Sequence, residues 1–89
     1  MSFAKYVKVR NEKFGAVLFD TLREKVYVTN ETGKDILDLM AQELDPAVIA
    51  QRLADSYGEE ASEILPQIAE FVEQLQSAGM LAGAEEAKA

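Results

Sequence analysis

The sequence predicts an α+β domain in which a three-stranded antiparallel sheet is followed by a cluster of three helices. Runs of β-forming residues near 5–11, 15–21 and 24–29 are separated by short polar links, as in a β-meander. The rest of the chain repeats its apolar residues at helical spacing, which predicts helices near 31–42, 46–57 and 60–78. Strands followed by helices in this order place the helices on one face of the sheet.

The three predicted strands differ in their apolar pattern. Residues 6–10, YVKVR, alternate apolar and basic side chains, which indicates a strand with one buried face. Residues 15–21, GAVLFDT, are apolar on both faces. The third strand is expected at an edge of the sheet, with Val26 and Val28 on one face and Tyr27 on the other. An exposed strand edge favours aggregation unless another segment covers it or uses it.

Capping residues mark the predicted helix ends. Asn30 is a good N-cap for the first helix, and Thr32 with Asp35 offers a rival cap one step on. The second helix begins with an Asp-Pro pair that puts Pro46 at its first position, and Gly58 ends it.

The third helix carries two apolar stripes. The main stripe is expected to face the core and consists of Ile64, Ile68, Phe71 and Leu75. A second stripe flanks it and consists of Leu65, Ala69, Val72 and Gln76. After the helix, Met80 and Leu81 are expected to fold back on the core. We therefore expect a single domain over residues 1–81 and a flexible tail over 82–89.

Composition excludes several functions. The chain has 89 residues, with no cysteine and no histidine. Disulfides, thiolate nucleophiles, zinc–thiolate sites and the usual general base are therefore absent. We expect no enzyme activity, no metal and no cofactor. A long apolar run and the apolar core of a signal peptide are also missing, so we expect a cytoplasmic protein without a membrane span.

Charge is divided unevenly along the chain. Residues 1–25 carry six Lys or Arg and three acids, a net charge of +3, whereas residues 26–89 carry three and thirteen, a net charge of −10. Three helices with a small sheet also suggest a winged helix that binds DNA. The third predicted helix argues against DNA, since it contains Glu63, Glu70 and Glu73 but no Lys or Arg for phosphate contacts.

One further hypothesis concerns the edge of the third strand. If the second stripe borders that edge, the two form a groove in which a partner peptide adds a fourth strand. The peptide-contacting residues predicted on this basis are Lys25, Val26, Tyr27, Val28, Thr29, Leu65, Ala69, Val72 and Gln76. The alternative is that both apolar stripes of the third helix are simply core.

The runs FGAVLFDTLREKVYVTNETGKDILDLM and PQIAEFVEQLQSAGML resemble the PqqD family over roughly residues 5–81. The resemblance implies a winged-helix-like RiPP recognition element, which is a peptide chaperone. Such modules bind the leader segment of a ribosomally made precursor peptide and present it to a modifying enzyme, commonly a radical SAM protein, as in PQQ biosynthesis. The resemblance also implies that the peptide lies beside the third strand and against the third helix.

The chain departs from the family pattern at two places. Many relatives have Leu where this chain has Thr29, and they often have Gly in the link that reads AQELDP here. The resemblance therefore leaves open whether the precursor belongs to the quinone pathway or to another modified peptide. The oligomeric state is also open between a monomer and a strand-paired or domain-swapped dimer, because a free strand edge can pair with its own copy.

Overall fold

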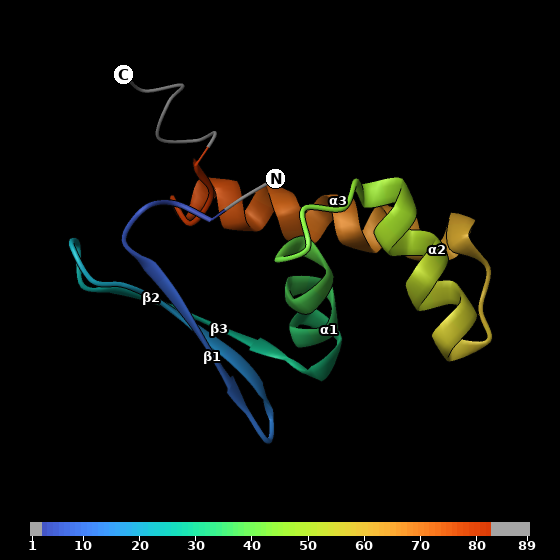
Figure 1. Cartoon of the computed structure of the whole chain (residues 1–89), viewed down its shortest axis with the longest axis horizontal. Helices are drawn as coiled ribbons and strands as arrows, with labels where there is room; N and C mark the ends of the chain where they lie inside the picture. The colour runs from blue at the N-terminus through green and yellow to red at the C-terminus, as the bar shows by residue number, and fades with distance from the viewer. Residues whose placement is uncertain (1–2, 83–89) are drawn as a thin grey trace.

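Three antiparallel strands precede three helices in the computed structural model, which describes residues 3–82 (Figure 1). The strands pair in the order β1-β2-β3 and span Val7–Glu12, Gly15–Asp20 and Lys25–Asn30. The helices α1, α2 and α3 span Glu31–Met40, Pro46–Tyr57 and Ala61–Ser77. The α+β prediction is therefore confirmed, and the first strand begins two residues later than the sequence indicated, at Val7.

The two faces of the sheet differ in burial. Ala16 and Leu18 of β2 are fully buried on the face that packs against the helices. On the open face, Phe19 is 38% exposed and its neighbours on β3, Val26 and Val28, are 59% and 58% exposed. As the sequence indicates, β2 is apolar on both faces, but helices cover one face only. An apolar surface on β2 and β3 therefore lies in contact with solvent.

The core lies between the sheet and the helices. Its largest fully buried side chains come from β2, from all three helices and from the segment after α3, and they are Leu18, Leu37, Met40, Ile49, Ile68, Leu75 and Met80. Gly79 ends α3 with φ +77°, and the Met80 amide then donates to the Leu75 carbonyl at 2.9 Å. Leu81 pairs with Phe3, so the two ends of the described chain meet.

The expected fold-back of Met80 and Leu81 onto the core is confirmed, because they are 1% and 2% exposed. The expected flexible tail, apart from Ala82, lies outside the described residues.

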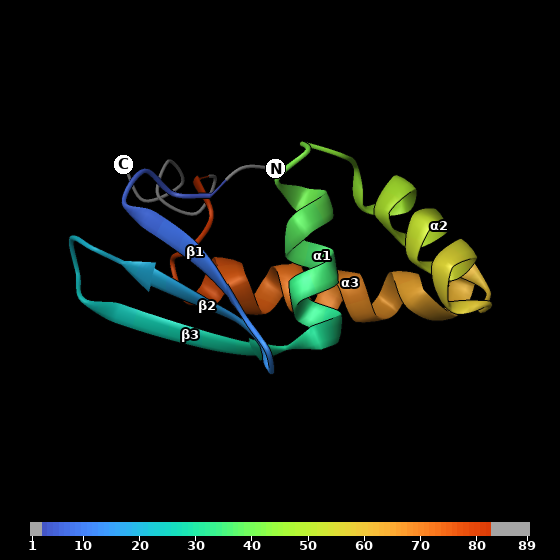
Figure 2. The same ribbon diagram turned by 60° about the horizontal axis from the view of Figure 1, so that its bottom comes forward.

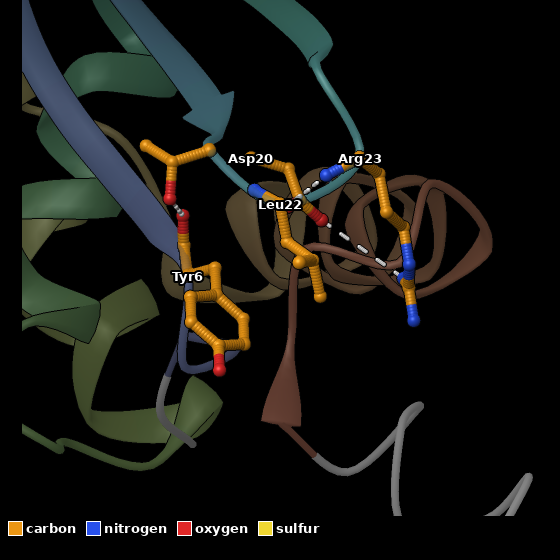
Figure 3. Close-up of polar contacts among 5 residues, drawn as sticks. Tyr6, Asp20, Leu22 and Arg23 are labelled. Carbon is orange, nitrogen blue, oxygen red and sulfur yellow. Dashed lines mark hydrogen bonds and ion pairs between the residues drawn. The ribbon is translucent and has the colours of Figure 1, made fainter.

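The turn between β2 and β3 is held by the Asp20 carboxylate (Figure 3). This side chain is buried, and its Oδ1 accepts hydrogen bonds from the backbone amides of Leu22 at 2.9 Å and Arg23 at 3.0 Å. The other oxygen, Oδ2, lies 3.9 Å from an Arg23 guanidinium nitrogen. Thr21 Oγ1 donates to the Tyr6 carbonyl at 3.1 Å, which ties the turn to the start of β1. Since turn geometry sets hairpin register, these bonds determine where each residue of β3 stands.

The junction between β3 and α1 is tight. The Asn30 side chain accepts the Gly33 amide at 3.0 Å, so Asn30 is the N-cap and the rival cap is not used. A Cβ at Gly33 would lie 1.8 Å from Thr29 Oγ1, which no packing tolerates. Glycine at 33 is therefore required for the close approach of α1 to the end of β3.

The second helix has one of its two expected caps. Asp45 stands at the N-cap position without a side-chain capping bond, and Gly58 ends the helix in the left-handed conformation, φ 70°. The Tyr57 hydroxyl donates to the Asp35 carboxylate and links α2 to α1. Burial, together with this bond and nearby negative charges, raises the pKa of Tyr57 to about 12.

Candidate functional site

The outer edge of β3 has no neighbouring strand within the described residues, because the sheet order is β1-β2-β3. Figure 2 shows β3 running alongside the C-terminal half of α3. The edge of β3 is therefore free to hydrogen-bond a further strand, and a helix forms the wall beside it. The edge of β1 is also free of a partner strand in this part of the chain, but α3 does not lie along it (Figure 2).

Two adjoining hollows lie between β3 and α3, with volumes of about 340 and 560 Å³. Both are lined by Tyr27 of β3 and by Glu70 and Gln74 of α3. The first hollow continues past Thr29 and Asn30 to the start of α1. We call this continuous depression the β3–α3 groove, and its principal side chains are Tyr27, Thr29, Gln67, Glu70, Phe71, Glu73 and Gln74.

Two aromatic rings lie at the centre of the β3–α3 groove. Tyr27 and Phe71 pack edge to face, with their ring centroids 6.3 Å apart and an angle of 68° between the planes. The Tyr27 hydroxyl donates to Gln74 Oε1 at 2.8 Å. Both rings also pack partly against the core, so their positions are set from behind. The groove therefore presents a preformed aromatic surface beside a free strand edge.

The charge of the β3–α3 groove is negative. Glu70 lines both hollows and Glu73 lines the second, and both side chains are exposed. None of the described residues that line the two hollows is Lys or Arg. The other polar groups on the walls are neutral amides and hydroxyls. The groove therefore favours a cationic guest over an anionic one.

The structure brings together only part of the site that the sequence predicted. Tyr27 and Thr29 line the β3–α3 groove, whereas Lys25, the exposed first residue of β3, lines neither hollow. The side chains of Val26 and Val28 stand on the open face of the sheet, so these two residues offer the groove their backbone alone.

The second stripe does not border β3. None of its four members lines either hollow. Leu65 is 40% exposed elsewhere on α3, while Val72 is half-buried and packs against the core. The helix wall of the groove is instead the opposite flank of α3, which consists of Gln67, Glu70, Phe71 and Gln74 and is called the groove flank below. Contact between a peptide and the second stripe stays a prediction.

Sequence reasoning missed the groove flank for an identifiable reason. It assigned Phe71 to the core stripe, where Ile64, Ile68 and Leu75 are indeed buried, but Phe71 is only half-buried. The other three members are polar: Gln67 and Gln74 were not considered, and Glu70, together with Glu73, was expected only to steer a basic segment of the partner. The four members of the groove flank follow the spacing i, i+3, i+4 and i+7, which places them on one side of a helix. An aromatic residue within a polar row at this spacing was the available signal.

No group of three or more acidic side chains in residues 3–82 is arranged to hold a metal ion. None of the three helices in this part of the chain combines the length and the apolar character needed to cross a membrane.

Comparison with solved structures identifies two similar folds. One is "Lasso peptide synthetase B1 complexed with the leader peptide", with a TM-score of 0.79 and 27% identity over 88% of this chain and 92% of the other. The second is "TbiB1 in Complex with the TbiA(beta) Leader Peptide", with a TM-score of 0.79 over 90% of this chain and 94% of the other. Its identity of 15% shows likeness of fold alone.

A search of the curated proteins gave no match. The family model described as "Coenzyme PQQ synthesis protein D (PqqD)" matches residues 15–81, which include β2, β3 and all three helices of the described fold. The matched region thus contains both walls of the β3–α3 groove. The chain belongs to the PqqD family.

Proposed function

We propose that this chain is a non-catalytic peptide chaperone that binds the leader segment of a ribosomally made precursor peptide in the β3–α3 groove. The observation that carries this proposal is the free edge of β3 beside the aromatic pair of Tyr27 and Phe71. An edge strand offers alternating N–H and C=O groups to a guest, and pockets beside it select alternate side chains. A bound guest strand would also cover the exposed edge of β3 and so prevent it from pairing with other chains in an aggregate.

The two halves of the site have different roles in this proposal. The backbone of residues 25–29 supplies main-chain hydrogen bonds, which are available to any extended peptide. Tyr27, Phe71 and their neighbours on α3 supply side-chain contacts, which distinguish one peptide from another. The structural relative of 27% identity supports leader binding by this chain, because that structure is a complex with a leader peptide.

Presentation of the bound peptide to a modifying enzyme is the second part of the proposal. The PqqD family assignment supports it, and the expected partner is a radical SAM enzyme. The absence of a cofactor and a cytoplasmic location remain predictions from the sequence. DNA binding is not favoured, since Glu63, Glu70 and Glu73 are exposed on α3 and would repel phosphates.

An NMR titration tests the binding step. The isotope-labelled chain is titrated with the leader half of a precursor peptide encoded beside its gene, and the remaining half of the same peptide serves as control. We expect shifts that cluster on residues 25–29 and 67–74 with the leader half and none with the control. Shifts confined to Lys8, Arg10 and the rest of β1 would mean that the guest uses the other edge of the sheet.

A modification assay tests the presentation step. The encoded radical SAM enzyme is incubated with its precursor peptide in the presence and absence of this chain. We expect faster modification with the chain present, and no gain when the precursor lacks its leader half. An equal rate in all three reactions would contradict the chaperone role while leaving peptide binding intact.

A further inference from the structure

The charges on the walls of the β3–α3 groove indicate what kind of peptide it binds, which the family assignment does not. Glu70 and Glu73 are exposed on the groove wall, and no described lining residue neutralises them. None of the described Lys or Arg residues lines either hollow, and residues 26–89, which include both walls of the groove, have a net charge of −10. A guest strand therefore enters a local field that favours positive charge.

Helix and strand dimensions allow both carboxylates to be used at once. Three residues of α-helix span about 4.5 Å along the axis, so the backbone positions of Glu70 and Glu73 are offset by roughly that distance along α3. Alternate residues of an extended guest, which share one face, are about 6.6–6.8 Å apart. The long side chains of Lys and Arg easily accommodate this difference. Two basic residues at consecutive helix-side positions of the guest can thus pair with Glu70 and Glu73.

The aromatic pair and the open face define the remaining guest positions. Tyr27 and Phe71 lie in the same groove as the two carboxylates and provide a contact for an apolar guest residue. The intervening guest residues point to the other face of the sheet, next to Val26 and Val28. These valines are 59% and 58% exposed and pair with β2 on one side only, so a neighbouring apolar side chain would cover them.

We propose that the β3–α3 groove selects a cationic peptide strand, with Lys or Arg on the helix side against Glu70 and Glu73 and apolar residues over Tyr27, Phe71, Val26 and Val28. This proposal rests on the proposed function, since it specifies the peptide that the same groove takes. It predicts a leader segment in which basic and apolar residues alternate. The charges increase the association rate and the selectivity, while the main-chain bonds and the aromatic contacts hold the peptide.

Selection from a random peptide library tests the proposal without knowledge of the natural precursor. A displayed library of random decapeptides is selected on the intact chain, on Glu70→Gln/Glu73→Gln, and on the control Asp38→Asn/Glu43→Gln. The control removes the same total charge at exposed residues outside the β3–α3 groove. We expect enrichment of Lys and Arg at positions of one parity with the intact chain and the control, and loss of that bias with Glu70→Gln/Glu73→Gln.

Binding of one enriched basic peptide gives the quantitative measure. We expect Glu70→Gln/Glu73→Gln to weaken it by about threefold to tenfold at low salt, with the difference shrinking as salt screens the charges. Neutral or acidic enriched peptides that still shift residues 25–29 and Phe71 would overturn the cationic preference and leave the proposed function standing. Enriched peptides that shift neither β3 nor α3 would overturn both.

Discussion

The two flanks of α3 are neighbours on one helix but have different surroundings. The second stripe is the more apolar of the two, with Leu65, Ala69 and Val72, yet it lies away from β3. The groove flank has one aromatic residue among Gln67, Glu70 and Gln74, and it forms the wall beside the free strand edge. Binding surfaces of transient complexes are about as apolar as the rest of a protein surface. Apolar character alone therefore does not identify the flank that we propose as the peptide wall, whereas its position beside a free strand edge does.

The largest loss of stability is expected from a substitution in the main stripe of α3, which lies between the two flanks. Ile68 is fully buried between them, so Ile68→Ala leaves a cavity in the core. Such changes cost about 2–5 kcal/mol. We expect Tm to fall by roughly 10 °C or more, as measured by circular dichroism, with loss of peptide binding only where the domain unfolds. A variant with unchanged Tm would mean that α3 is not anchored through this stripe.

Phe71 and Val72 allow the sharpest comparison, because they are adjacent, both half-buried, and on opposite flanks. Each change to Ala removes apolar contacts with the core, so both variants should lose about 1–2 kcal/mol of stability. Only Phe71→Ala also removes the groove's aromatic contact. We expect it to weaken leader binding by about tenfold, on the order of 1.4 kcal/mol, and Val72→Ala to change binding less than about twofold.

Calorimetric titration of the folded variants with the leader half decides between the two flanks. The reverse result, with binding lost in Val72→Ala and kept in Phe71→Ala, would restore the second stripe as the peptide wall. Equal losses in both variants would indicate that binding follows the stability of α3 and not contact with either flank.

The smallest effect concerns the hydrogen bond that crosses the groove. Tyr27→Phe keeps the ring against Phe71 but removes the donor to Gln74. An exposed bond of this kind contributes about 0.5–1.5 kcal/mol. We expect a drop in Tm of a few degrees and a change in leader affinity of about twofold, measured by the same methods. Gln76→Ala, on the second stripe, is the control and should change neither; a similar change in both would show that the bond has no separate role.

Local patterns in the sequence were sufficient to predict most of the fold. Alternating and continuous apolar runs located the three strands, and helical spacing located the three helices, with every boundary within two residues of the observed one. Asn30 and Gly58 act as the expected helix ends because capping depends on residues close together in the chain. The free strand edge could also be predicted from local patterns, because the last strand of a three-stranded meander lies at an edge of the sheet.

The packing of α3 against β3 was decided by tertiary structure alone. Both flanks of α3 have helical spacing, so no pattern in the sequence distinguishes the groove flank, which lies beside β3, from the second stripe, which lies away from it. That choice depends on the direction in which α3 crosses the sheet, which follows from the fit of Ile64, Ile68 and Leu75 into the core and from the close approach of α1 at Gly33. Composition and periodicity thus determined the elements and the free edge of this protein, while long-range packing determined which polar and aromatic side chains stand beside that edge.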